Sequence, residues 1–151
     1  MAASGVFAKL NLKDQGEILV LNTPAGFEPE LRKLAHVTVQ TRLPSRGSVS
    51  FALVFATRQA EVDAAAAQLA KLTVGDATVW FAYPKGSSKR YECDFNRDTG
   101  WRALGQAGFE PVRQIAIDED WTALRFRRAE FIKSMTRNCA LSKTGKAKAG
   151  L

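Results

Sequence analysis

The sequence of 151 residues is poor in the side chains from which disulfide frameworks and metal sites are built. It holds two cysteines, Cys93 and Cys139, and a single histidine, His36. Two thiols so far apart do not form a disulfide framework, and their spacing is not that of a metal-binding motif. With one histidine, the usual Cys/His ligand set for zinc is also missing. We therefore expect neither a metal ion nor any other cofactor.

Long apolar runs and a leader segment are also missing. No run approaches the roughly 20 apolar residues that a membrane-spanning helix needs. Residues 1–15 contain neither the basic region nor the apolar segment of a secretory signal, so we expect a cytoplasmic protein without a membrane partner. A hydrophobic fraction of 46% and a charged fraction of 25% are ordinary for a globular chain of this length. Its length favours one domain.

The net charge of +7 lies entirely at the C-terminal end. Residues 125–151 hold eight basic residues and one acidic residue, whereas residues 1–124 hold 14 of each sign. We predict a single domain over residues 1–132 and a basic, flexible tail over residues 133–151. Such a tail attracts nucleic-acid phosphates weakly and without sequence preference.

Short apolar runs alternate with helical patterns along the chain. Strands are expected at residues 17–24, 36–40, 49–56 and 77–84, and a hairpin at residues 112–118 and 121–128. Helices are expected at residues 29–35, at residues 58–72 with Thr57 as the N-cap and Gly75 beyond the end, and from Asn96 or Asp98 to Ala107.

This order predicts an α/β, Rossmann-like three-layer sandwich with a mostly parallel six-stranded sheet. Right-handed crossovers place the second and third strands on either side of the first, which gives the order 2-1-3-4-6-5 with a C-terminal antiparallel hairpin. The order depends on the loop at residues 41–48. If that loop makes a tight turn instead, the second and third strands form a hairpin.

Four segments together resemble an uncharacterised bacterial domain family of unknown function. They are the Asn22-Thr23-Pro24 turn, the segment YPKGSS, the segment NRDTGW and the ending DEDWTALRF at residues 118–126. The resemblance implies a Rossmann-like fold but carries no established activity.

The layout is also similar to that of the S-adenosylmethionine-dependent methyltransferases. Two departures concern the cofactor. The turn after the first strand has one glycine, Gly26, instead of a GxGxxG motif. Thr41 and Arg42, rather than an acidic residue, follow the second strand. Binding of a nucleotide cofactor in the usual mode is therefore not expected.

Ligands of open α/β sheets bind beyond the carboxyl ends of the strands. The loop from Lys85 to Ser88 follows a strand there and resembles an anion-binding turn. A solvated turn is the simpler interpretation of this loop, and core packing is the simpler role for the tryptophans. The candidate ligand-binding residues are Asn22, Thr23, Thr57, Arg58, Lys85, Ser87, Ser88, Arg97 and Trp101.

No catalytic set is apparent. Glu92 and Asp94 flank Cys93, and their charges would raise its pKa and suppress a thiolate nucleophile. Asp118 and Asp120 fit a hairpin turn better than an acid–base pair. We expect an uncharacterised, non-catalytic protein that binds a small anionic ligand or a protein partner at the carboxyl edge. Two alternatives stay open: a divergent S-adenosylmethionine-dependent methyltransferase-like enzyme, and a nucleic-acid accessory protein that acts through its basic tail.

Overall fold

The computed structural model describes residues 6–13, 16–34, 37–44, 48–89, 91–95 and 100–132. The predicted tail at residues 133–151 lies outside the described residues, as does the candidate ligand-binding residue Arg97. The two predicted helix caps, Asn96 and Asp98, also lie outside them, and so do His36 and Cys139.

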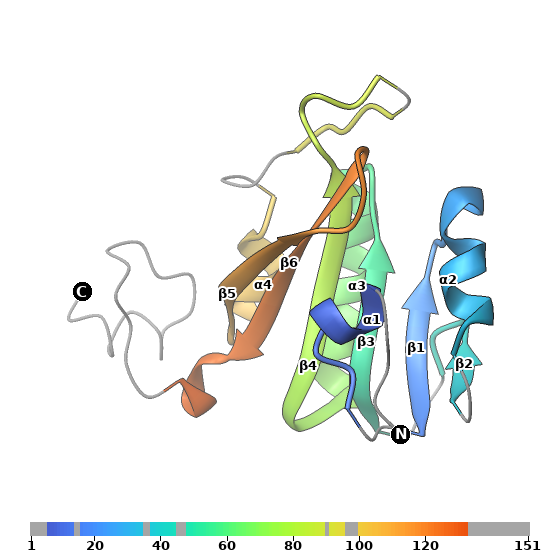
Figure 1. The fold of residues 1–151 in the computed structure, drawn as a ribbon. Coiled ribbons are helices and arrows are strands. Elements are labelled where there is room, and N and C mark those ends of the chain that lie inside the picture. The colour runs from blue at the N-terminus through green and yellow to red at the C-terminus, as the bar shows by residue number, and fades with distance from the viewer. Residues whose placement is uncertain are drawn as a thin grey trace.

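Six strands form one sheet in the order β2-β1-β3-β4-β6-β5 (Figure 1). Their bounds are Glu17–Leu21 (β1), Thr38–Gln40 (β2), Val49–Phe55 (β3), Thr73–Pro84 (β4), Phe109–Ala116 (β5) and Trp121–Arg128 (β6). Strand β1 pairs in parallel with both β2 and β3, β3 pairs in parallel with β4, and β6 is antiparallel to β4 and β5. The predicted fold class and strand order are confirmed, and β2 and β3 lie on either side of β1 rather than pairing as a hairpin.

Helices cover both faces of the sheet. Helix α3 (Gln59–Leu72) and helix α4 (Arg102–Gln106) contribute to the apolar cluster on one face. On the other face lie helix α1 (Val6–Lys9), the 3-10 turn η1 (Ala25–Phe27) and helix α2 (Glu28–Arg32). A second 3-10 turn, η2 (Ala129–Phe131), follows β6. None of the described helices has the length and apolar character that crossing a bilayer requires.

Strand β4 is buried on both faces, as a central strand of such a sheet should be. Val79 and Phe81 join the cluster beneath α3 and α4, whereas Trp80 joins the cluster beneath α1. The Trp80 indole Nε1 donates a hydrogen bond to the Leu10 carbonyl at 2.8 Å. This bond satisfies the only polar atom of a fully buried side chain and holds the end of α1 against the sheet.

Several boundaries differ from the sequence prediction. Helix α1 was not predicted, and it forms because Phe7 and Leu10 are buried against the sheet. Strand β4 begins at Thr73 rather than at residue 77, so Gly75 lies inside the strand, with a φ of 57°. Helix α2 ends at Arg32.

The predicted N-cap of α3 is one residue too early. The helix begins at Gln59 with Arg58 as the N-cap, and the backbone N–H groups of Thr57 and Arg58 both donate to Glu61 Oε1, at 2.9 and 3.1 Å. The Gln59 N–H donates to Asp94 Oδ1 at 2.6 Å. A carboxylate from a distant segment therefore replaces the hydroxyl cap that the sequence suggested.

Candidate functional site

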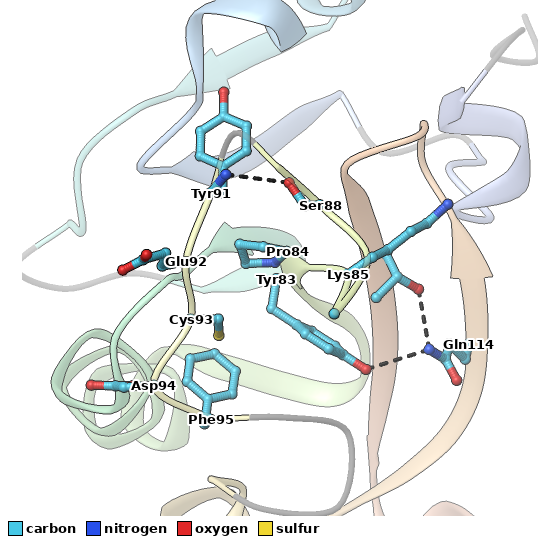
Figure 2. A pocket seen from close by; sticks show the side chains of 12 residues that line it. Tyr83, Pro84, Lys85, Ser88, Tyr91, Glu92, Cys93, Asp94, Phe95 and Gln114 are labelled. Carbon is cyan, nitrogen blue, oxygen red and sulfur yellow. Dashed lines mark hydrogen bonds between the residues drawn. The ribbon is translucent and has the colours of Figure 1, made fainter.

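A wide cleft of about 900 Å³ opens at the carboxyl end of β4 (Figure 2). This volume lies within the range of about 300–1,000 Å³ that is typical of small-molecule sites. The end of β4, the segment at residues 91–95 and the β5–β6 hairpin form its walls. The lining residues are Tyr83, Pro84, Lys85, Gly86, Ser88, Tyr91, Glu92, Cys93, Asp94, Phe95, Gln114 and Thr122.

Tyr83, Gln114 and Thr122 form a hydrogen-bonded group on the hairpin side of this β4 cleft (Figure 2). The Gln114 amide Nε2 donates to the Thr122 hydroxyl at 3.2 Å and to the Tyr83 hydroxyl at 3.4 Å. The Thr122 hydroxyl in turn donates to the Ile115 carbonyl at 2.9 Å. Because Thr122 is opposite Tyr83 in the β4–β6 register, the sheet itself fixes two members of the group.

The opposite wall is the segment at residues 91–95, which is tied to the start of α3. The Asp94 N–H donates to the Thr57 carbonyl at 3.1 Å, and the Asp94 carboxylate accepts from the Gln59 N–H. The Phe95 ring is buried and lies 5.8 Å from the Tyr83 ring, between centroids. Gly100 has a φ of +93°, and a Cβ there would lie 2.8 Å from Phe95 Cβ, so only glycine permits this close packing. Asp94 is therefore a structural residue of this wall.

Cys93 is half-buried in the cleft, with its sulfur near the Phe95 ring (Figure 2). Burial is the main cause that raises the pKa of this thiol, and the charges of Asp94 and Glu61 raise it further. A hydrogen bond with the Phe95 backbone acts in the opposite direction. The thiol is therefore protonated at neutral pH, which agrees with the sequence argument against a thiolate nucleophile.

Three donors of the Lys85–Ser88 loop are used within the protein. The Lys85 N–H donates to the Asp120 carbonyl at 2.8 Å, the Ser88 N–H to the Lys85 carbonyl at 2.9 Å, and the Ser88 hydroxyl to Asp120 Oδ1 at 2.9 Å. The Asp118 carboxylate accepts from the N–H groups of Asp120 and Trp121, both at 2.8 Å. The loop is thus fastened to the hairpin turn, and these donors do not form an open anion cradle.

The structure brings the described loop candidates to one edge of the sheet but not into one site. Lys85 and Ser88 line the β4 cleft, and Ser87 is exposed beside them. Asn22 and Thr23 follow β1, and Thr57 and Arg58 follow β3, where Thr57 binds Glu61. Trp101 is buried at 4% exposure and packs with the rings of its neighbours, namely Phe81, Tyr83, Phe95 and Phe126.

Sequence reasoning missed the polar group of Tyr83, Gln114 and Thr122. The predicted strand order already made β4 and β6 neighbours, so alternation along both strands could have paired Tyr83 with Thr122. Gln114 carried no such signal, because its position depends on the register shift in β5 between Pro111 and Arg113.

Comparisons with known proteins point to one fold. No family model matches the chain, and no curated protein matches it. The fold is similar to that of a methyltransferase dependent on SAM (S-adenosylmethionine) from Aquifex aeolicus, with a TM-score of 0.63, 13% identity, and coverage of 82% of this chain and 87% of that one. An N-methyltransferase from Bradyrhizobium japonicum has a TM-score of 0.53 and 12% identity, with coverage of 82% of this chain and 92% of that one. A ribosomal protein L11 methylase from Lactobacillus delbrueckii has a TM-score of 0.54 and 10% identity, with coverage of 81% of this chain and 76% of that one.

These similarities place the chain in the methyltransferase-like class of Rossmann folds. They also overturn the expectation of a non-catalytic binding protein, because the neighbours named here are all methyltransferases. The sequence argument gave the absence of familiar motifs more weight than the methyltransferase-like layout. The resemblance to an uncharacterised bacterial family stays a prediction, since no family model matches.

The turn after the first strand, where such folds usually bind their cofactor, does not form a cofactor-binding site of the usual kind in this chain. Asn22 occupies the turn after β1 with a φ of 57°, and its amide donates to the Phe55 carbonyl at 3.1 Å. The buried Phe27 ring lies 4.9 Å from that of Phe55. Exposed Thr41 and Arg42 follow β2. The residues present therefore do not fit a nucleotide cofactor in the usual mode.

Proposed function

We propose that this chain is a divergent methyltransferase-like enzyme and that its ligand site is the β4 cleft. The observation that carries the proposal is the position of this cleft, at the carboxyl edge of a sheet whose strand order places it among methyltransferase folds. S-adenosylmethionine is the donor to be tested, because the SAM-dependent protein from Aquifex aeolicus has the highest TM-score of the three neighbours.

The chemistry of the β4 cleft suits a ligand with an aromatic base and a positive charge. The rings of Tyr83 and Phe95 offer stacking surfaces and favour a cation near their faces. The Gln114 amide provides a polar group at one end, and the exposed Glu92 provides a carboxylate near the opposite wall (Figure 2). The hydroxyl and amide groups would orient the ligand, and the buried rings would exclude water from one side of it.

Isothermal titration calorimetry with S-adenosylmethionine and with its demethylated product tests the proposal. We expect a measurable heat with at least one of them. Gln114→Ala should weaken binding by about 3- to 10-fold, because a typical hydrogen bond contributes about 0.5–1.5 kcal/mol. The control Gln68→Ala removes an exposed glutamine from α3 and should leave affinity unchanged.

A second pair of variants separates the cleft from the end of β1. Glu92→Gln removes a negative charge from the cleft and should weaken binding, whereas Asn22→Ala alters only the turn after β1 and should not. Absence of heat with either ligand at millimolar concentration contradicts the proposal. Equal losses in Gln114→Ala and Gln68→Ala would remove the β4 cleft as the site. A cytoplasmic location and a domain boundary at residue 132 stay predictions.

A further inference from the structure

Three arginines lie on one face of the β5–β6 hairpin. Arg113 of β5 is directly opposite Arg125 of β6 in the register, and Arg127 follows two positions along β6, on the same face. Arg125 is also opposite Trp80 of β4, so this is the face on which α1 packs. In Figure 1, α1 lies in front of the central strands, and no described helix lies in front of β5 and β6. We call these three residues the hairpin arginines.

The hairpin arginines include a donor that the protein leaves unsatisfied. The Arg125 Nε atom is buried and has no hydrogen-bond partner among the residues that the structure describes. Burial, followed by the charge of Arg127, lowers the pKa of Arg125; the charge of Asp76 acts in the opposite direction, and that of Arg113 lowers the pKa further. An arginine stays protonated at neutral pH despite such a shift. Like charges directly opposite one another on a sheet destabilise it, so this arrangement calls for an anion.

Two described carboxylates, Asp76 and Glu110, lie beside the three hairpin arginines, so this cluster keeps one positive charge in excess. Asp76 accepts three hydrogen bonds from Arg127, the shortest at 2.6 Å, and is thereby engaged. Glu110 is opposite Arg127 in the register and is fully buried. The segment at residues 133–151 contains five basic side chains and no acidic one, so it adds no carboxylate side chain.

We propose that the hairpin arginines bind the phosphodiester backbone of a nucleic acid, without sequence preference. Guanidinium groups match phosphate oxygens in charge and in forked geometry. Arg113 and Arg125 are directly opposite one another, with Cβ atoms about 4.5–5.5 Å apart at the usual spacing, so both guanidinium groups can contact the same stretch of a polyanion. The basic residues of the tail then continue the same positive charge along the chain. This surface lies on the opposite face of β5 from Gln114, so it is independent of the β4 cleft.

The test measures binding of the full chain to fluorescein-labelled single-stranded 20-mers by anisotropy, from 50 to 200 mM salt. An RNA and a DNA 20-mer of the same sequence show which nucleic acid binds. The proposal requires that at least one of them binds. Arg113→Gln with Arg125→Gln should weaken binding by tenfold or more at 50 mM salt. Two lost phosphate contacts should also reduce the slope of log affinity against log salt by about 1.4.

The matched control is Arg32→Gln with Arg42→Gln, which removes the same charge from exposed positions at the other edge of the sheet. It should leave both the affinity and the salt slope near those of the unmodified chain. If the Arg125 variant fails to fold, Arg113→Gln alone should give about half of the slope change, because Arg113 is exposed.

Three results would overturn the proposal. Equal losses in the two double variants would mean that net charge alone, or the tail, drives binding. Binding to neither 20-mer would remove nucleic acid as the partner. Displacement of the 20-mer by polyglutamate as effectively as by unlabelled RNA would indicate an acidic protein partner instead.

Discussion

Arg128 is the residue whose removal should most clearly loosen the β5–β6 hairpin from the rest of the sheet. Its Nη2 atom donates to the Ala70 carbonyl and the Thr73 carbonyl, both at 3.2 Å, and to the Thr73 hydroxyl at 2.7 Å. Its guanidinium carbon lies 4.9 Å from the centroid of the Phe109 ring. One side chain therefore joins the end of α3, the start of β4 and the first residue of β5.

The expected cost of Arg128→Ala follows from these contacts. Hydrogen bonds to a charged group contribute about 1.5–3 kcal/mol, and a cation–ring contact adds about 0.5–1 kcal/mol. We expect a loss of about 3 kcal/mol in the free energy of unfolding, and a fall in Tm of about 6–12 °C for a domain of this size. Urea unfolding followed by fluorescence measures the free energy, and calorimetry measures the Tm.

The neighbouring Arg127→Ala is the matched control. Arg127 pairs with Asp76 while both side chains stay about one-third exposed, at 33% and 34%. A pair of this kind contributes about 0.2–1 kcal/mol. If Arg128→Ala lowers the free energy of unfolding by no more than Arg127→Ala does, the reasoning from the three acceptors of Arg128 is refuted.

Three further predictions concern the core, the thiol and the response to acid. Trp101→Ala should destabilise the fold by about 3–5 kcal/mol in urea unfolding, because its indole is buried among four rings; a cost below 1 kcal/mol would refute a core role. In a Cys139→Ser background, Cys93 should react with iodoacetamide at pH 8 more slowly than a free cysteine, since its pKa is raised; equal rates would contradict this. The pKa of Asp76 is lowered below its ordinary 3.8, chiefly by the hydrogen bond from Arg127. The stability that this pair adds should therefore be present above about pH 5 and be lost below about pH 4, as the carboxylate protonates. The stability difference between the unmodified chain and Arg127→Gln should therefore shrink towards pH 2.5, and a constant difference would contradict the assignment.

The strand order could be predicted because it depends on local signals. Each strand was an apolar run between turn residues, and the loop at residues 41–48 was long enough to return along the sheet. The hairpin at Asp118–Trp121 was likewise visible, because its Asp side chain caps its own turn. These features need only residues near one another in sequence.

The β4 cleft could not be predicted in the same way, because distant segments build it. Asp94 caps α3 across 35 positions of sequence, and Gln114 reaches Tyr83 across 31. Trp101 was a ligand candidate in the sequence but is part of the core in the structure, since rings from β4 and β6 surround it. Motif spacing carries no information about such contacts.

The most direct test of the account is a two-dimensional ¹H–¹⁵N NMR titration of the full chain with S-adenosylmethionine. We predict that chemical-shift changes concentrate in the β4 cleft, at Tyr83, Cys93, Gln114 and Thr122. Changes concentrated at the turn from Asn22 to Phe27 instead, or none at millimolar ligand, would contradict the central claim that the β4 cleft is the ligand site of this methyltransferase-like fold.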